Sequence, residues 1–565
     1  MKVLLTAVNA KYIHSNLAVY DLRAYAEAYG TGGAQVEIGE YTINHTIDYI
    51  LEGIYKAKPD VLCFSCYIWN LDYVEQLMDE YHKICPEVPI WVGGPEVSYE
   101  TEAFLKAHPQ VTGAMVGEGE ETFLELCENY AKAGAGAKAG KVDFPGIKGI
   151  MYRAGESLVK TGAREPLDLN RIPFCYGAVE DFRNRIIYYE SSRGCPFRCS
   201  YCLSSIDKRV RFRSLALVKK ELQVFLDARV PQVKFVDRTF NCNPRRTVEL
   251  LNWIQEHDNG VTNFHFEIAA DITTEEELAI MEQMRPGLIQ LEIGVQSTNP
   301  KTVEAIHRTM DLTKLAEVVS RVKGFGNIHQ HLDLIAGLPY ENLESFQKSF
   351  DDVYGMQPDQ LQLGFLKVLK GSGMKEDADG YEIRYHEHAP YEVLTTRWLN
   401  YGEVLTLKGV EEMVEVYYNS RQFDRTIAHI MEQYDSPYRF FLELAEYYDR
   451  KGLSGIGHSR IARYEILRAF LEEKKLSGPD NDQCMVLDLY ARENLKSRPA
   501  FAPDLSPYKE ELKNLTRDYG RQVHVEVLEK ASGPEYVMFD YRKRDPLTGE
   551  ARMEVLGGTG ERHDG

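Results

Sequence analysis

Short apolar runs alternate with amphipathic stretches through the first 130 residues of the chain. The runs have the length of buried strands and lie at Lys2–Val8, Val61–Tyr67, Pro89–Val92 and Gly113–Val116. Stretches with helical spacing separate them, for example Asn16–Tyr29 and Leu71–Ile84. Such β/α alternation, with glycines at the strand ends, is typical of doubly wound parallel sheets. We therefore expect an N-terminal Rossmann-like domain whose ligand lies beyond the carboxyl ends of the strands.

The alternation returns between residues 185 and 370. Six strand-like runs lie at Ile186–Glu190, Gln232–Asp237, Asn263–Ala269, Gly287–Gly294, His329–Ala336 and Gln360–Leu366. Helical stretches lie between them at Leu215–Ala228, Pro244–His257, Thr274–Met284, Thr313–Lys323 and Leu343–Met356. Six β/α units in about 180 residues predict a partial (β/α)6 TIM-type barrel and not a complete eightfold one, with its chemistry at the carboxyl ends of the strands.

The remaining chain has a different character. Tyr391–Lys475 is mostly helical, and three later runs predict a small β-hairpin element at Val523–Leu528, Tyr536–Tyr541 and Arg552–Leu556. We expect an α/β protein in four parts: the Rossmann-like domain over 1–135, a linker over 136–180, the barrel over 181–370 and a C-terminal accessory domain over 371–565. The low-complexity sequence of 131–141 marks the linker, which we expect to hold short strands around Gly149–Tyr152 and Pro166–Arg171.

Charge and hydropathy limit the binding partners and the cellular location that we expect. The 565 residues include 66 basic and 86 acidic side chains, for a net charge of −20. This balance argues against broad docking on nucleic acid or on an anionic membrane. No stretch approaches the ~20 apolar residues of a membrane span, and the N-terminus does not resemble an export signal. We therefore expect a cytoplasmic protein whose thiols stay reduced.

Three of the 10 cysteines stand close together as Cys195, Cys199 and Cys202. Random placement gives this spacing about 0.003 times per chain, so the motif has a chemical reason. Three thiolates can hold three irons of a [4Fe–4S] cube and leave the fourth iron open to a ligand. Structural zinc is the alternative, but zinc usually takes four protein ligands, and only the isolated Cys242 follows nearby.

The segment from Tyr188 to Cys202 resembles the signature loop of radical S-adenosylmethionine (SAM) enzymes. Motifs later in the chain are similar to those of the family in the same order: 236–240, 292–297 and 334–339. The resemblance implies a [4Fe–4S] cluster held by the three cysteines and reductive cleavage of SAM. The residues it assigns to the cofactors are Tyr201, Asp237, Glu267, Glu292, Gln296, Ile335 and Gly337. For Glu267, Glu292 and Gln296 the alternative is an ordinary polar residue at a strand end.

A doubly wound domain in front of such a barrel resembles the cobalamin-binding subclass of the family. The positions that this resemblance assigns to cobalamin are His14, Ser65, Gly93, Gly94 and Glu118. A generic Rossmann-like turn explains each of them singly. The DxHxxG motif that places a histidine on cobalt is absent, so we expect His14 to contact the corrin edge and not the metal.

The resemblance implies a cobalamin-dependent C-methyltransferase that acts on an unactivated carbon of a small molecule or peptide. It also implies a one-electron donor such as flavodoxin or ferredoxin. It assigns no catalytic side chain and no substrate. A radical rearrangement, cyclisation or oxidation without methylation is an alternative, and a noncatalytic cobalamin sensor is another. An RNA methylthiotransferase needs a second cluster, for which the scattered Cys63, Cys66, Cys85 and Cys127 are poor ligands.

Overall fold

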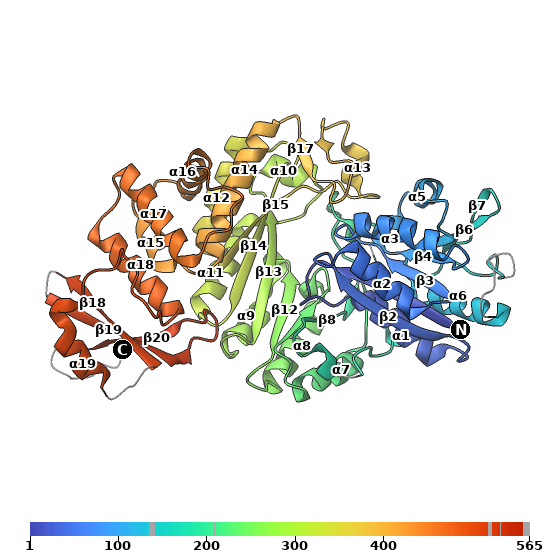
Figure 1. The fold of residues 1–565 in the computed structure, drawn as a ribbon, viewed down its shortest axis with the longest axis horizontal. Coiled ribbons are helices and arrows are strands. Elements are labelled where there is room, and N and C mark those ends of the chain that lie inside the picture. The colour runs from blue at the N-terminus through green and yellow to red at the C-terminus, as the bar shows by residue number, and fades with distance from the viewer. Residues whose placement is uncertain (135–141, 178, 208, 518–521, 531–532, 557–565) are drawn as a thin grey trace.

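The computed structural model describes residues 1–134, 142–177, 179–207, 209–517, 522–530 and 533–556. Its N-terminal α/β domain and a central open barrel lie side by side, and a helical region packs on the far side of the barrel (Figure 1). A small antiparallel sheet ends the described chain. The α/β fold expected from the sequence is confirmed. Most of the expected linker sequence 131–141 lies outside the described residues.

The N-terminal sheet has seven strands in the order β2-β1-β3-β4-β5-β6-β7. The first five pair in parallel, and their bounds are β1 (Lys2–Asn9), β2 (Gln35–Thr42), β3 (Val61–Ser65), β4 (Ile90–Gly93) and β5 (Gly113–Met115). Helices cover both faces: α1 (Leu17–Tyr29), α2 (Ile47–Ala57), α3 (Leu71–Ile84), α4 (Pro95–Ser98), α5 (Thr101–Ala107) and α6 (Glu120–Ala133). Alternate residues of β1 enter two separate hydrophobic cores, as a doubly wound sheet requires.

The segment expected as a linker is partly built into this sheet. Strands β6 (Ile150–Ala154) and β7 (Ser157–Lys160) add to β5 as an antiparallel hairpin. The strand expected at Pro166–Arg171 is absent from the described residues there, and a 3-10 turn, η2 (Leu169–Arg171), takes its place. Asp168 caps this turn by accepting a hydrogen bond from the Asn170 amide, a side-chain bond that competes with strand pairing.

The central sheet is the partial barrel expected from the sequence. Its six parallel strands follow the order β15-β14-β13-β12-β11-β8. Their bounds are β8 (Ile187–Tyr189), β11 (Gln232–Phe235), β12 (Asn263–Ile268), β13 (Ile289–Gln296), β14 (His329–Ala336) and β15 (Gln360–Phe365). The covering helices are α7 (Leu215–Asp227), α8 (Pro244–Glu256), α9 (Glu275–Glu282), α10 (Pro300–Ala305), α11 (Leu312–Phe325) and α12 (Leu343–Gly355). Buried apolar residues face these helices, and the opposite face of the sheet is polar.

Neighbouring parts of the chain cover both edges of the open barrel. At β8, the Ile186 amide donates to the Ile13 carbonyl (2.8 Å), and the Ser15 hydroxyl donates to the Ile186 carbonyl (3.1 Å). At β15, the Asn419 amide side chain bonds both the amide (2.9 Å) and the carbonyl (2.8 Å) of Leu361. These contacts satisfy backbone groups that an exposed strand edge leaves open.

The C-terminal region begins with α13 (Gly373–Asp377), β16 (Arg384–Tyr385) and β17 (Val393–Thr395). Its helices are α14 (Tyr401–Val414), a π-helical turn η7 (Glu415–Asn419), α15 (Asp424–Met431), α16 (Pro437–Arg450), α17 (Arg460–Lys474), α18 (Pro479–Arg492) and α19 (Lys509–Thr516). The expected hairpin element is a three-stranded sheet of β18 (Val523–Lys530), β19 (Gly533–Arg544) and β20 (Ala551–Leu556). No helix among the described residues is long and apolar enough to cross a membrane.

Candidate cofactor and substrate site

The cysteine motif lies in a loop that is closed at its base. Strand β9 (Ser192–Arg193) enters the loop and pairs with β10 (Arg211–Phe212), which leaves it. Gly194 has φ +97°, and a Cβ there would lie 2.2 Å from the carbonyl oxygen of Arg209. A residue with a side chain cannot occupy this crossing without displacing backbone. The loop conformation is therefore fixed by a strand pair and one glycine.

A guanidinium lies beside the loop's most buried thiol. Arg308, just after α10, places Nη1 3.8 Å from the Sγ of Cys199, and its Nη2 donates to the Gly294 carbonyl. Burial raises the pKa of the Cys199 thiol, and the positive charge of Arg308 opposes this rise. Tyr201 packs in the small core between loop and barrel, and the Thr239 hydroxyl lies 3.6 Å from the Cys195 Sγ. Sequence reasoning missed Arg308 because nothing local links it to the cysteines.

The three thiols are not gathered as the ligands of one metal ion. Among the residues that the structure describes, Cys195, Cys199 and Cys202 do not form a group of ligand atoms that all lie within 4.8 Å of one another. A tetrahedral zinc ion with Zn–S bonds of about 2.3 Å needs its sulfurs about 3.8 Å apart. A cube of iron and sulfide holds its thiolates on separate corners. The donor set fits the cluster better than zinc.

Asp237 supports the base of the loop. Its carboxylate accepts from the Ser191 amide (2.7 Å), the Ser191 hydroxyl (2.6 Å) and the Ser192 hydroxyl (2.7 Å). Burial raises the pKa of Asp237, and these donors partly offset the rise. With most of its acceptor capacity used, Asp237 positions the strand that carries the cysteines. The family resemblance predicts instead that Asp237 contacts a cofactor.

The later motif residues gather at the carboxyl ends of β13 and β14. Gln296 ends β13 at φ +72°, after a bulge, and its buried Oε1 has no hydrogen-bond partner among the described groups. Ile335 contacts the same small core as Tyr201. Gly337 has φ +87°, and a Cβ there would lie 2.7 Å from Val393 of β17. The start of the C-terminal region thus packs directly over this strand end.

The polar face of the barrel carries a line of titratable side chains. Glu292 of β13 lies 2.9 Å from the Lys234 Nζ and 3.0 Å from the His265 Nε2. Although burial works against ionisation, these two partners lower the pKa of Glu292 to about 2. Burial raises the pKa of its neighbour Glu267 to about 7. At neutral pH Glu292 is therefore ionised, whereas Glu267 is near the midpoint of its titration.

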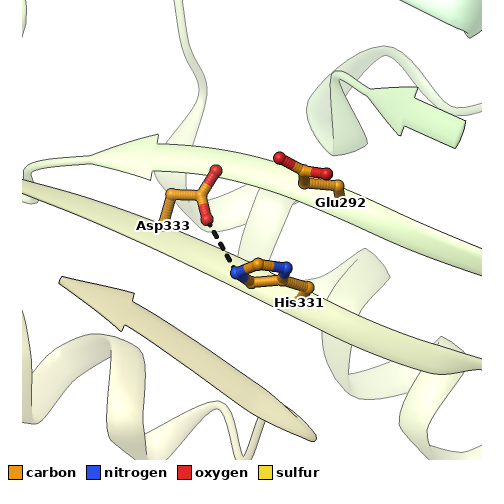
Figure 2. Close-up of side chains that lie close together, drawn as sticks. All are labelled: Glu292, His331 and Asp333. Carbon is orange, nitrogen blue, oxygen red and sulfur yellow. Dashed lines mark ion pairs between the residues drawn. The ribbon is translucent and has the colours of Figure 1, made fainter. Parts of the chain in front are cut away.

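The next strand adds His331 and Asp333, which sequence reasoning missed. Figure 2 shows both pointing from β14 to the same side as Glu292. The Nε2 of His331 lies 3.1 Å from an Asp333 oxygen. Together with His329, they place charged or titratable side chains at every second position of the strand from His329 to Asp333. That alternation is visible in the sequence and could have found them.

The carboxyl ends of the N-terminal strands face the barrel. His14, in the loop after β1, shares a 2.6 Å hydrogen bond between its Nδ1 and the Tyr188 hydroxyl of β8. Burial lowers the pKa of His14, which favours the neutral imidazole. Ser65 ends β3 and accepts from Asn16 (3.0 Å). Beyond it, Tyr67 stacks on the half-exposed Trp69 at 4.4 Å. This flat aromatic pair was missed by sequence reasoning.

Gly93 and Gly94, at this edge of the sheet, are glycines for different structural reasons. Gly94 has φ +112°, and a Cβ would lie 2.5 Å from the Cys66 carbonyl oxygen, so chain packing alone requires glycine there. Gly93 meets only ordinary contacts with Met115. Its backbone lies at the end of β4, where a ligand can approach closely. A corrin bed of Ser65, Gly93 and the aromatic pair thus fits the groups present.

Glu118 joins the two domains. Its carboxylate pairs with Arg211, lies 3.4 Å from Arg193 and accepts from the Leu167 amide at 2.8 Å. Arg193 also contacts Glu120 at 2.7 Å. Because Arg193 and Arg211 are the strand pair that closes the cysteine loop, the cluster loop is tied directly to the N-terminal domain. The sequence instead predicted Glu118 as a cofactor contact.

The remaining N-terminal cysteines are dispersed. Cys63 and Cys66 are fully buried in two different cores, and Cys127 is buried in α6. Burial raises the pKa of the Cys63 thiol to about 12. Buried neutral thiols of this kind are packing residues. They supply no second cluster site among the described residues.

Three family profiles match consecutive parts of the chain. Residues 3–127 match the B12 binding domain, and residues 189–353 match the radical SAM superfamily. Residues 379–540 match a family described as a protein of unknown function, DUF4080. The first two matches coincide with the doubly wound sheet and the open barrel. A radical SAM domain implies a [4Fe–4S] cluster and SAM, and a B12 binding domain implies cobalamin.

Known proteins share this organisation. The cobalamin-dependent radical SAM methyltransferase TokK of Streptomyces tokunonensis is 26% identical over 390 residues, which are 65% of this chain and 53% of TokK. The chain thus spans about half the length of that relative. The fold is similar to TsrM of Kitasatospora setae, a radical SAM methyltransferase solved with cobalamin and a [4Fe–4S] cluster (TM-score 0.55, 16% identity, 69% of this chain and 79% of TsrM). It is also similar to OxsB, a cobalamin-dependent SAM radical enzyme (TM-score 0.57, 16% identity, 85% of this chain and 78% of OxsB).

Proposed function

Because this chain belongs to the cobalamin-binding radical SAM proteins, we propose that it is a methyltransferase acting on an unactivated carbon. The observation that carries the proposal is the direct contact between the N-terminal domain and the cysteine-loop end of the barrel. The strand ends of the B12 binding domain meet the cysteine-loop end of the barrel through Arg193–Glu120 and His14–Tyr188. One substrate can therefore reach both cofactor beds.

The bound cofactors supply reductive cleavage of SAM and a transferable methyl group. Cys195, Cys199 and Cys202 hold the cluster, and Arg308 places a positive charge beside the Cys199 sulfur. Asp237 and Gly194 fix the loop on which the three thiols stand. Gln296, Ile335 and Gly337, at the ends of β13 and β14, form the bed for SAM, while Tyr201 packs between that bed and the loop.

On the facing side, Ser65, Gly93 and the Tyr67–Trp69 pair contact the corrin. His14 stays on the Tyr188 hydroxyl, at the corrin edge, and does not ligate cobalt. Gly94 allows the close backbone packing at the end of β4, and Glu118 holds the cysteine loop against the N-terminal domain. Glu267 and Glu292 are register partners on the polar face, where they would face SAM or the substrate.

Radical SAM chemistry needs an external reductant, and we propose a flavodoxin or ferredoxin for this role. The substrate is a small molecule or peptide, since a net charge of −20 disfavours docking on RNA. The segment that begins with Val393 packs over the SAM bed at Gly337. The C-terminal region is therefore in place to select the substrate.

A second reaction class uses the same cofactors without methylation. OxsB, whose fold covers most of this chain, is described only as a cobalamin-dependent SAM radical enzyme. Rearrangement, cyclisation or oxidation is the corresponding candidate for this chain.

The first test measures cofactors and SAM cleavage on anaerobically reconstituted protein. We expect about four irons and one cobalamin per chain, and 5′-deoxyadenosine when SAM and a low-potential reductant are added. Cys199→Ala should abolish the nucleoside but keep cobalamin bound. Cobalamin binding without SAM cleavage by the wild type would favour a sensor, and about eight irons would favour a methylthiotransferase; either result overturns the proposal.

A further inference from the structure

We propose that Glu292, His331 and Asp333 bind a first-row divalent cation, such as Zn²⁺ or Mn²⁺, on the polar face of the barrel. This site is separate from the cysteine loop and from the cofactors named above. Its three ligand atoms, one from each side chain, all lie within 4.8 Å of one another. One imidazole and two carboxylates are a common ligand set for these metals.

The sheet itself brings the three side chains together. Glu292 of β13 is the register partner of His331 of β14, and Asp333 follows two residues later on the same face. Figure 2 shows all three directed into one space above the two strands. Because ligands on paired, regular strands are held by the backbone ladder, the site does not depend on a mobile loop.

The closest pair in the group, His331 and Asp333, is an ion pair without a well-formed hydrogen bond. The His331 side chain has 9% of its surface exposed, and its Nε2 lies 3.1 Å from the Asp333 Oδ1. Both atoms are buried, yet no hydrogen bond of acceptable geometry joins them or reaches them from elsewhere in the described chain. Buried polar atoms without partners are costly and rare.

Metal coordination explains that geometry. Ligand atoms bonded to one ion at about 2.1 Å lie roughly 3.0–3.4 Å apart, with their lone pairs aimed at the ion. The His331–Asp333 pair has this separation. The His265 Nε2 repeats the pattern, since it lies 3.0 Å from Glu292 Oε2 and also has no hydrogen bond. His265 can therefore support the site or add a fourth ligand.

Lys234 limits the affinity without closing the site. Its Nζ bonds only Oε2 of Glu292, at 2.9 Å, which leaves Oε1 for a cation. A neighbouring ammonium repels a second positive charge, so the wild-type site should bind more weakly than one without the lysine. Replacing Lys234 by methionine then tightens metal binding if a cation site is present.

The site is distinct from the cluster. Glu292 lies four residues before the end of β13, which corresponds to about 13 Å along a strand. The Gln296 end of β13 is at the far side of that distance, and the cysteine loop reaches β13 through Arg308 at Gly294, two residues from Glu292. The cation is therefore available to a polar substrate group that enters the barrel below the SAM bed.

The test counts metal on the full-length chain. Cys195, Cys199 and Cys202 are first replaced by alanine, so that Zn²⁺ or Mn²⁺ cannot occupy the cluster site. Equilibrium dialysis against each metal, followed by elemental analysis, should give one ion per chain. His331→Gln and Asp333→Asn should each weaken binding at least tenfold, and Lys234→Met should tighten it.

His329→Gln is the matched control, because His329 lies on the same strand and face but outside the ligand group. It should leave the affinity unchanged, and circular dichroism should report the same fold for every variant. The proposal is overturned by the absence of stoichiometric metal in the cysteine-free chain. It is equally overturned if His331→Gln binds as tightly as its parent, or if metal binds only after Lys234 is removed.

Discussion

The Nη1 of Arg308 lies 3.8 Å from the Sγ of Cys199 and its Nη2 donates to the Gly294 carbonyl, so one guanidinium links a cluster ligand to barrel strand β13. The cysteine is 109 residues away along the chain. Hydrogen bonds and charges at cluster sulfurs set the reduction potential of iron–sulfur proteins. Arg308 is therefore placed to ease the one-electron reduction that starts the reaction.

Replacing Arg308 by glutamine should lower the cluster midpoint potential by roughly tens of millivolts, because the reduced cluster loses a stabilising positive charge. Arg308→Lys keeps the charge and should shift the potential less. The measurement is a redox titration followed by electron paramagnetic resonance. Arg198→Gln, in the same loop but exposed to solvent, is the control, and an equal shift there would contradict the assignment.

Gly194→Ala should disrupt the cysteine loop. The new Cβ meets the Arg209 carbonyl at 2.2 Å, and the positive φ adds strain of about 1–3 kcal/mol. We expect iron and sulfide contents well below those of wild type, with a lower Tm. Gly162→Ala, where no atom lies within 4 Å of the added Cβ, should retain both. A fully loaded Gly194→Ala protein would show that the loop conformation is not required.

Most of the fold follows from local pattern. The run His329–Ala336 is β14 to the residue, because buried strands have a strong apolar signal and short turns around them. Strand β2 (Gln35–Thr42) was missed because Gly39 and four charged or polar residues of the strand weaken its signal. The hairpin β6–β7 joins the first sheet by tertiary pairing, which no local pattern specifies.

The site was predictable only where the motif is local. The three cysteines stand within eight residues of one another, so their spacing alone indicated a cluster. Arg308 and Trp69 reach the site from distant segments, and only folding brings them there. Asp237 and Glu118 were expected to hold cofactors, but their carboxylates are occupied by serine hydroxyls and by arginines.

A buried carboxyl predicts a pH dependence of stability. Glu341 accepts from the Ser297 and Ser349 hydroxyls (2.7 and 2.9 Å), and burial raises its pKa to about 7. In the unfolded chain the Glu341 carboxyl ionises near pH 4.5. The free energy of unfolding should therefore fall as the pH rises from about 4.5 to about 7, by up to about 3 kcal/mol. Glu341→Gln removes this loss.

The measurement is the free energy of unfolding of wild type and Glu341→Gln at pH 5 and pH 8. The advantage of the variant over wild type should grow between these values. Glu344→Gln, exposed on the first turn of α12, should keep the wild-type slope. Parallel curves for wild type and Glu341→Gln would contradict the prediction.

Asn419 should stabilise the β15 edge of the barrel. Asn419→Ala leaves the Leu361 amide and carbonyl without partners and should cost about 1–3 kcal/mol. Hydrogen exchange at the Leu361 amide should become faster. Ser420→Ala removes a hydroxyl that donates to the Val416 carbonyl and accepts from the Gln422 amide but does not contact β15, and it should leave that exchange unchanged. Equal protection of the Leu361 amide in both variants would show that Asn419 does not stabilise the β15 edge.

Transfer of a labelled methyl group tests the central claim most directly. The reconstituted protein is incubated anaerobically with methyl-deuterated SAM, cobalamin, a reductant and a small-molecule and peptide extract, and the products are analysed by mass spectrometry. We predict a product with a deuterated methyl group on carbon, formed together with 5′-deoxyadenosine and absent with Cys199→Ala. Formation of 5′-deoxyadenosine with a changed but unlabelled product would contradict methyl transfer and assign the chain to the non-methylating reactions.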